Sequence, residues 1–291
     1  MYPPARKIIN TFGIGIAINE INQPFQGFVM HEGLIIAASG GIKQQVKMDV
    51  LANNMANLNN AGFKSDGLVF REIYPPFDED SSAEASKNAM LPPNDSSANV
   101  AYVAVDTLYT DHSQGTFHTT GNPLDLALEG EGFFEVDTPN GVRYTRNGNF
   151  SMKDKFLVTQ DGNYLLDTNK QKIKIEDTTG EIDVASDGLI TLGSGFGNQP
   201  AGTIRLVKFE DLKALAKEGN GLYKIIDNEA KPLKADNVRI AQGVLERSNV
   251  NTIEEMTKMI TAIRGFEAYQ KVIQTIDEAD DQAVNSIGRV V

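Results

Sequence analysis

The chain of 291 residues contains no cysteine. This absence excludes disulfides, a thiolate metal site and a thiol nucleophile. Positive charge is also scarce, because 27 Lys and Arg stand against 39 Asp and Glu, for a formal net charge of −12. A nucleic-acid partner needs clustered basic residues for its phosphates, so the sequence disfavours one. No apolar run approaches the ~20 residues that span a bilayer, which predicts a chain that does not cross a membrane.

Catalytic and metal-binding motifs are lacking as well. The three histidines are His31, His112 and His118. None stands at a metal-ligand spacing, and neither a nucleophile elbow nor a phosphate-binding loop is present, so we expect no metal and no cofactor. Glu129 and Glu131 resemble a glycosidase pair only in type, because carboxylates two residues apart in a Gly-Glu-Gly turn do not set the required spacing. We therefore expect no enzymatic activity.

The clearest positive pattern lies at the C-terminus, where residues 252–288 carry apolar side chains at helical spacing. These residues are Met256, Ile260, Ile263, Phe266, Tyr269, Ile273, Ile276, Ala283 and Ile287. We expect Thr252 to cap the first turn, with Glu255 reaching back in a capping box. Such a long apolar stripe needs a partner surface.

The candidate partner is a second amphipathic helix over residues 35–60. Its apolar line continues at 3-4-3 spacing, a heptad step, through Met48, Leu51, Met55 and Leu58. Beside this line lies an amide cluster: Asn53, Asn54, Asn57, Asn59 and Asn60. The cluster is either a solvated helix face or a polar stripe buried between subunits, where paired amides would fix the register. Gly62 is expected to end the helix.

The whole chain divides into five predicted segments. They are residues 1–29, a loose extension or a mis-called start before Met30; 30–74, the N-terminal helical segment; 75–99, an acidic flexible loop; 100–247, a central β-domain; and 248–291, a C-terminal helix that pairs with the N-terminal one. The first segment superficially resembles a secretory signal, but it lacks a cleavage site. The acidic loop is rich in Ser and Ala, with little to bury.

Residues 100–247 show the alternation and turn dipeptides of an antiparallel β-domain. Tight turns are expected at Asn140-Gly141, Asp161-Gly162 and Asp187-Gly188, a half-exposed strand over 172–176, and one short helix over Glu210–Lys217. The predicted fold class is α+β, mostly β. Terminal amphipathic helices pack as a coiled-coil-like layer, and the antiparallel β-domain is inserted between them.

Four blocks of sequence resemble the bacterial flagellar rod and hook proteins. They are residues 48–64, 120–134, 144–150 and 246–269, in that order along the chain. Within this family the chain most resembles the proximal rod proteins, with the distal rod proteins as the close alternative. Met55 and Leu58-Asn59-Asn60 depart from the family pattern and leave the helix intact.

The resemblance implies a structural subunit of the flagellar basal-body rod, which polymerises through its terminal helices and transmits torque across the periplasm. Its partners would be other rod proteins, copies of itself and the flagellar export apparatus, which exports such subunits without a cleaved signal peptide. A hook-family subunit and a non-catalytic, oligomeric surface-binding protein are the alternatives. The candidate subunit-interaction residues are Met48, Leu51, Asn53, Asn54, Met55, Asn57, Leu58, Met256, Ile260, Ile263, Phe266, Tyr269, Ile273 and Ile276.

Overall fold

The structure is a computed structural model. It describes residues 32–73, 102–175, 181–194, 197–227, 229–235 and 237–287. The expectations for segments 1–29 and 75–99 therefore lie outside the described residues.

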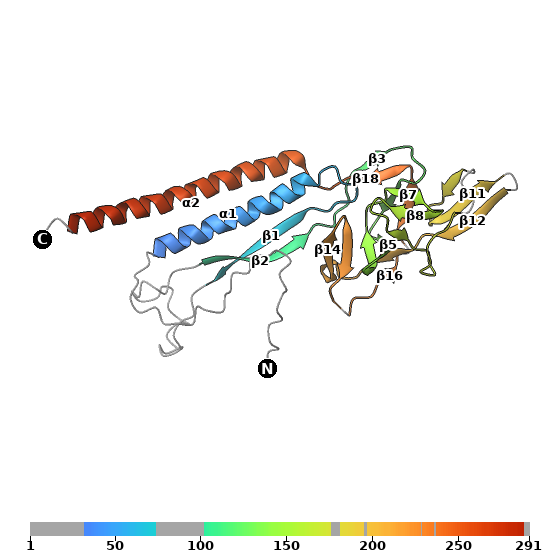
Figure 1. Ribbon diagram of the computed structural model, residues 1–291, viewed down its shortest axis with the longest axis horizontal. Helices are drawn as coiled ribbons and strands as arrows, with labels where there is room; N and C mark the ends of the chain where they lie inside the picture. Colours follow the sequence, from blue (N-terminus) through green and yellow to red (C-terminus); the bar gives the residue numbers. More distant parts are fainter. Residues whose placement is uncertain are drawn as a thin grey trace.

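Two long helices lie side by side and run in opposite directions (Figure 1). Helix α1 spans Glu32–Ala56 and helix α2 spans Thr252–Ile287. Both predicted helices are confirmed, although α1 covers 32–56 instead of the predicted 35–60. Helix α1 ends at Ala56 because the chain then turns, with the Asn60 amide donating to the Asn57 carbonyl at 3.2 Å.

The start of α2 differs from the expected capping box. Asn251, not Thr252, caps the helix, because its Oδ1 accepts from the amides of Ile253 (3.1 Å) and Glu254 (3.4 Å). Asparagine at this position satisfies amides that have no partner within the helix. The prediction of Thr252 as the cap was wrong, and Glu255 turns instead toward α1.

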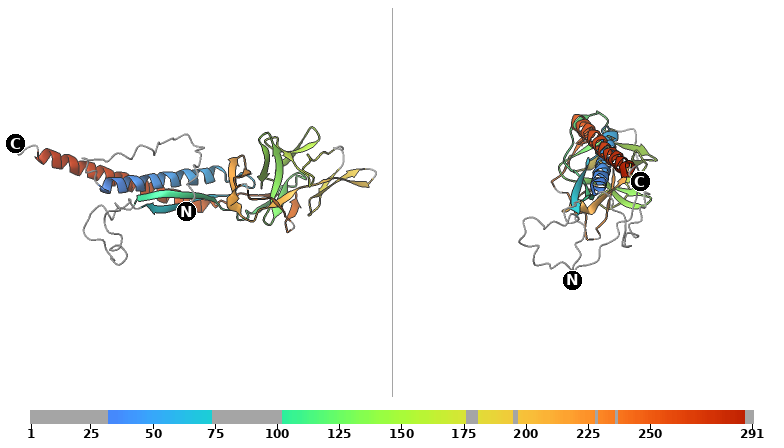
Figure 2. Two further views of the ribbon diagram at one scale, coloured as in Figure 1. Left: turned by 90° about the horizontal axis from the view of Figure 1, so that it is seen from below. Right: turned by 90° about the vertical axis from the view of Figure 1, so that its left-hand side faces the viewer.

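A two-stranded antiparallel ribbon packs against α1. Strand β1 spans Asp66–Ile73 and β2 spans Tyr102–Thr110, paired from Asp66↔Thr110 to Ile73↔Tyr102. Figures 1 and 2 show the helices and this ribbon at one end of an elongated molecule, with the remaining strands at the other. Strand β2 thus lies with the helices, although the sequence placed residues from 100 onward in the central β-domain.

The other end of the molecule is built from short strands. They are β3 (Phe117–Thr119), β4 (Leu126–Glu129), β5 (Phe133–Thr138), β6 (Gly141–Thr145), β7 (Phe150–Lys153), β8 (Phe156–Thr159), β9 (Tyr164–Leu165), β10 (Ile182–Val184), β11 (Leu189–Ser194), β12 (Gly197–Thr203), β13 (Leu206–Lys208), β14 (Leu215–Gly219), β15 (Leu222–Ile225), β16 (Leu233–Lys234), β17 (Arg239–Gln242) and β18 (Val244–Glu246).

The largest sheet has the order β14-β15-β6-β5-β9-β8-β7, and β13 pairs with β5 and β16 beside it. All strand pairs among the described residues are antiparallel. The three predicted tight turns connect β5–β6, β8–β9 and β10–β11. The α+β, mostly β class is confirmed.

The predicted helix over Glu210–Lys217 was wrong. A single 3-10 turn occupies Leu212–Ala214, and β14 follows at once, with Leu215 opposite Ile225 of β15. Pairing with a strand that comes later in the chain outweighs the local helix preference. The expected strand over 172–176 is also reduced, because Lys172 and Lys174 form only isolated bridges.

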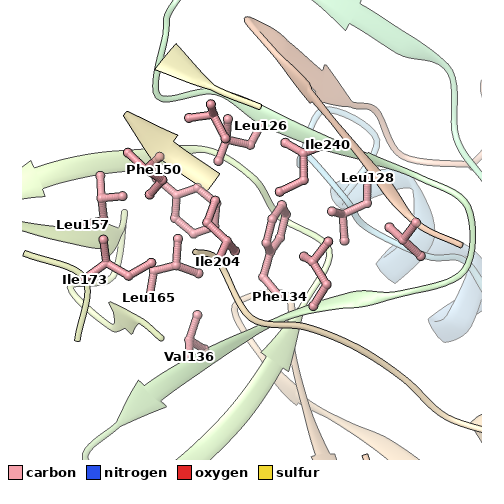
Figure 3. Packing of buried hydrophobic residues seen from close by; sticks show 14 of the residues in the cluster. Leu126, Leu128, Phe134, Val136, Phe150, Leu157, Leu165, Ile173, Ile204 and Ile240 are labelled. Carbon is pink, nitrogen blue, oxygen red and sulfur yellow. The ribbon is translucent and has the colours of Figure 1, made fainter. Parts of the chain in front are cut away.

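The core of this β-domain lies between the sheets (Figure 3). Phe134 of β5 and Phe150 of β7 meet edge to face, with ring centroids 5.1 Å apart and an interplanar angle of 89°. Around them lie buried aliphatic residues, including Leu126, Leu128, Val136, Leu157, Leu165, Ile173, Ile204 and Ile240. The core joins strands from the whole middle of the chain into one unit.

Candidate assembly site

The contact between α1 and α2 is built on small residues. Ala37 of α1 and Ala262 of α2 are fully covered. A Cβ added to Gly40 would lie 2.4 Å from the ring of Tyr269, so the absence of a side chain lets that ring lie directly on the α1 backbone. The two helices therefore approach closely, and any larger side chain at Gly40 would push Tyr269 aside.

The predicted apolar line of α1 faces partly inward. Leu51 is buried, while Met48, Met55 and Leu58 are half-buried. On α2, from its first turn as far as Ile276, the side chains that are buried or half-buried are Glu255, Met259, Ala262, Phe266, Tyr269, Ile273 and Ile276. The last four were predicted. The first three are offset by one residue from the predicted Met256, Ile260 and Ile263, which rotates the contact by about 100° around the helix.

The offset leaves a second apolar row on α2 in solvent. It consists of Ile253, Met256, Ile260 and Ile263, here called the outward row, whose exposed fractions are 79%, 49%, 51% and 41%. Sequence reasoning missed Ile253, which continues the same 3-4-3 spacing toward the N-terminus. A contiguous exposed apolar strip is a candidate contact surface.

The amide cluster at the end of α1 divides into two groups. Asn54 is buried, and its Oδ1 accepts from the Asp66 amide (2.9 Å) while its Nδ2 donates to the Asp66 carbonyl (2.9 Å) and to Glu255 Oε2 (3.1 Å). This one side chain ties α1 to β1 and to α2. In contrast, Asn57 and Asn60 bond locally: Asn57 Nδ2 donates to the Asn53 carbonyl at 2.8 Å, and Asn60 Nδ2 donates to Asn57 Oδ1 at 2.6 Å.

Where the helices join the β-domain lies a buried group of charges, here called the ionic junction: Lys64, Arg146 and Glu246. Lys64 Nζ donates to Glu246 Oε1 at 2.5 Å, and Arg146 Nη1 donates to Glu246 Oε2 at 3.3 Å. The exposed fractions of the three side chains are 0%, 4% and 1%. One carboxylate thus serves two buried cations.

Backbone groups complete the ionic junction. Lys64 Nζ also donates to the Ser113 carbonyl (2.8 Å), and Arg146 Nη2 donates to the Gly130 carbonyl (2.6 Å). Desolvation lowers the pKa of Lys64 and of Arg146, and the charge of Glu246 opposes both shifts. Because an unpaired buried charge is costly, each member depends on the others.

Two glycines allow the chain segments to meet here. Gly62 has φ +67°, and a Cβ added to it would lie 2.4 Å from the Arg146 carbonyl carbon. Gly115 donates its amide to Glu246 Oε1 (2.9 Å), and a Cβ there would lie 1.9 Å from the Arg247 carbonyl oxygen. Four backbone segments that are distant in sequence therefore touch at the ionic junction.

A second set of polar contacts surrounds the ionic junction. Lys217 Nζ lies 2.8 Å from Asp66 Oδ1, which also accepts from Thr110 Oγ1 at 2.7 Å. Asn249 Oδ1 accepts from the Ser65 amide (2.8 Å), and its Nδ2 donates to the Asp111 carbonyl (2.9 Å). These contacts join the ribbon, the β-domain and the approach to α2.

Sequence models of three flagellar protein families match the chain in order. "Flagella basal body rod protein" matches residues 34–64, "Flagellar hook protein FlgE/F/G D1 domain" matches 127–192, and "Flagellar basal body rod FlgEFG protein C-terminal" matches 241–286.

Full-length relatives agree with these matches. The chain is similar to the flagellar basal-body rod protein FlgG of Bacillus subtilis, with 33% identity over 264 residues, which cover 88% of this chain and 99% of that protein. It is also similar to the flagellar basal-body rod protein FlgF of Caulobacter vibrioides, with 34% identity over 262 residues, covering 90% and 100%. The chain belongs to the flagellar basal-body rod protein family.

It is thus a structural subunit of the rod in the basal body of the bacterial flagellum. A further relative of this rod protein is the flagellar hook-basal body complex protein FlhO of Bacillus subtilis, with 32% identity over 282 residues, covering 90% and 100%.

Each of the three family matches contributes one member of the ionic junction of this rod protein. Lys64 closes the first match, Arg146 lies within the second and Glu246 lies near the start of the third. The sequence blocks that carry the family resemblance are therefore the segments that meet where the helices join the β-domain. These blocks are recognisable in the sequence, but nothing in the sequence signals that their charges converge.

In the part of the rod protein that the structure describes, no helix is both long and apolar enough to cross a membrane. Within the same residues, no group of three or more His, Cys, Asp or Glu side chains is placed to hold a metal ion.

Proposed function

We propose that this rod subunit assembles with copies of itself and with other rod proteins through its paired terminal helices, and that the rod transmits torque across the periplasm. The observation that carries the proposal is the outward row of α2, which stays exposed in the single chain. Covering it would stabilise a contact by about 25 cal/mol per Å² of apolar surface. A heterologous contact that does not close into a ring extends into a helical tube.

The predicted interaction residues take two roles in this proposal. Met256, Ile260 and Ile263 contact the neighbouring subunit. A second group holds the two helices of one subunit in a coiled-coil-like layer: Met48, Leu51, Asn54, Met55, Leu58, Phe266, Tyr269, Ile273 and Ile276. Asn53 and Asn57, at the end of α1, are the candidates for a polar contact between subunits.

We also propose the cellular placement that family membership implies. The subunit is exported by the flagellar export apparatus without a cleaved signal peptide and takes a periplasmic position in the rod. It carries no catalytic activity.

Relatives named FlgF and FlgG are similar to it at nearly equal identity. The 120–128 block favours the proximal rod, which a low copy number per basal body would support.

Substitution within the outward row tests the assembly proposal. Ile263→Asp places a charge where a neighbour would bury it, and an unpaired buried charge costs several kcal/mol. We expect a subunit that folds but is absent from purified basal bodies, in cells that have lost motility. The measurements are electron microscopy of basal bodies, a swimming assay and the thermal unfolding of the free subunit.

Thr261→Asp is the matched control. Thr261 is exposed and lies two residues away, which places it about 200° around the helix from Ile263. The same charge there should leave motility intact. Normal motility with Ile263→Asp, or an equal defect with both variants, would remove the outward row from the assembly surface.

A further inference from the structure

Three Asn-Gly pairs occur in the chain, at residues 140–141, 147–148 and 220–221. At such a pair the glycine nitrogen attacks the side-chain carbonyl carbon of the asparagine, ammonia leaves, and a cyclic succinimide forms. Water then opens the ring to aspartate or isoaspartate. Glycine hinders the attack least because it has no side chain and its backbone turns freely. By sequence the three pairs are equal candidates for this reaction, and the fold makes them different.

The pair at 220–221 is the most open of the three. Asn220 and Gly221 form the two-residue turn between β14 and β15, which Gly219 and Leu222 close. Both turn residues are exposed, and their φ angles of +51° and +70° fit the type I′ turn that Asn-Gly favours. Among the described residues, neither the Asn220 side chain nor the peptide group that joins it to Gly221 has a hydrogen-bond partner. This peptide group is free to rotate toward the side chain.

The pair at 140–141 is exposed but more constrained. Gly141 begins β6 and pairs with Thr138 across the turn. The hydrogen bond that characterises a β-turn joins the carbonyl of its first residue to the amide of its fourth, so it engages the nitrogen that would attack. The Gly141 carbonyl also accepts from Thr138 Oγ1 at 2.6 Å. We expect Asn140 to react more slowly than Asn220.

The pair at 147–148 is held on both sides. Asn147 Oδ1 accepts from the Asn149 amide at 3.0 Å, which fixes the side chain in an Asx-turn. Gly148 is buried, and a Cβ added to it would lie 1.5 Å from the Leu126 carbonyl oxygen. Backbone this close to another segment cannot rotate into a succinimide unless the region first opens locally.

We propose that Asn220 is a site of spontaneous covalent modification in the folded subunit, where asparagine is converted to aspartate and isoaspartate. The overall reaction consumes one water and releases one ammonia, and it needs no further reactant. The site is separate from the outward row of α2 and does not depend on the assembly proposal.

The modification changes a turn close to the ionic junction. Figure 1 shows β14 where the ribbon meets the β-domain, and the Gly221 carbonyl accepts from Thr145 Oγ1 at 2.9 Å. Thr145 directly precedes Arg146 of the ionic junction. Isoaspartate carries the main chain through the side-chain carbons and adds one atom to the turn, so the Gly221 carbonyl can no longer keep its position beside Thr145. The new carboxylate also lies two residues from Glu218.

The test is peptide mass spectrometry of the full chain, sampled during incubation at mildly alkaline pH, where the amide nitrogen loses its proton more readily. One sample is folded and the other is kept in concentrated guanidinium chloride. In the folded chain we expect Asn220 to convert first and Asn140 more slowly. Asn147 should be slower than Asn220 by about tenfold or more, because it waits for local opening.

The denatured chain is the control for the fold. Without structure, the three pairs should convert at similar rates, since each has glycine as its second residue. Conversion of Asn147 as fast as Asn220 in the folded chain would overturn the inference. The same relative rates in both samples, or Asn140 ahead of Asn220 in the folded one, would overturn it as well.

Two matched variants assign the modification to the turn. Asn220→Gly keeps the turn, because Gly-Gly also favours type I′, and it should abolish the first acidic form that ion-exchange chromatography resolves. Asn140→Gly removes the slower site and should leave that form unchanged. An acidic form that still appears at the original rate in Asn220→Gly would contradict the assignment.

Discussion

At the scale of single residues, Glu246 is the carboxylate on which the ionic junction of this rod protein depends. Its two oxygens neutralise Lys64 and Arg146, both of them buried, and one oxygen also accepts the Gly115 amide. A buried ion pair adds little stability compared with an apolar equivalent, but removal of one partner leaves a buried charge without compensation. The ionic junction is therefore sensitive to a change of a single atom.

Glu246→Gln should accordingly destabilise the fold strongly. The amide keeps the shape of the side chain and removes its charge, so two cations stay buried without a counter-ion. We expect a loss of about 3–5 kcal/mol in the free energy of unfolding, measured by urea denaturation of the full chain. Glu218→Gln, which breaks a surface pair with Arg143, should cost under about 1 kcal/mol. Similar losses in the two variants would mean that the ionic junction is solvated.

His112 makes the stability of the β-domain depend on pH. Burial, and after it the nearby cations Lys64, Arg146 and Lys217, lower its pKa from the ordinary value of 6.5 to about 4 in the folded chain. The unfolded chain therefore binds more protons between these two values. The free energy of unfolding is therefore highest above pH 6.5, where His112 is neutral in both states, and it decreases as the pH falls from 6.5 to about 4. His112→Phe keeps an aromatic ring beside Phe133 and Tyr223 and should remove this part of the slope. Urea unfolding of both chains between pH 7 and pH 4 measures how the free energy of unfolding depends on pH. The same dependence in both chains would contradict the lowered pKa of His112.

At the scale of elements, the turn after α1 sets how the helices meet the β-domain. Gly62 sits in this turn with φ +67°, and its amide donates to the Glu246 carbonyl at 2.8 Å. Backbone lies on both sides of it. No rotamer change can relieve a clash between a new Cβ and another backbone segment.

Gly62→Ala should therefore cost more than the usual strain of a left-handed residue, which is about 1–2 kcal/mol. Gly121→Ala is the matched control, because Gly121 has φ +75° and nothing within 4 Å of an added Cβ. We expect Gly121→Ala to show the strain alone and Gly62→Ala to show strain plus clash, as a larger drop in the melting temperature of the full chain. Equal drops would mean that the turn can move away from Arg146.

Features set by local sequence were predictable, and those set by distant contacts were not. The helices over 32–56 and 252–287 follow from periodicity, and the turn at Asn140-Gly141 follows from its dipeptide. The local preference of strand β14 favours a helix. Its pairing with β15, which comes later in the chain, outweighs that preference. The inner face of α2 includes Glu255 and Ala262, the two buried residues of this helix among those described. One is charged and the other is small, so a pattern of large apolar residues does not mark them.

At the scale of the whole molecule, the ionic junction connects the helical layer to the β-domain. The helical layer carries the proposed contacts with neighbouring subunits, and the β-domain carries the bulk of the core. A rod that transmits torque needs little rotation between these two ends. The buried charges, the Asn54 bonds and the tight glycine contacts all act against such rotation.

At this scale α1 and α2 pair within one subunit, and a disulfide between them distinguishes this pairing from an exchange between neighbours. A Cβ added to Gly41 would lie 3.9 Å from Tyr269 Cβ, within the range of about 3.5–4.5 Å found across disulfides. The chain has no other cysteine, so a pair introduced at these positions can react only with itself or with another copy.

We expect the Gly41→Cys/Tyr269→Cys variant to close a disulfide within the monomer. Mild oxidation of the dilute subunit should give a faster-migrating monomer on a non-reducing gel, which reducing agent converts back. The two single-cysteine variants are the controls and should show no such band. A ladder of cross-linked dimers and larger species at low concentration would instead mean that α1 of one subunit pairs with α2 of the next. In that case the outward row would contact a third helix, and the helical layer would be continuous along the rod.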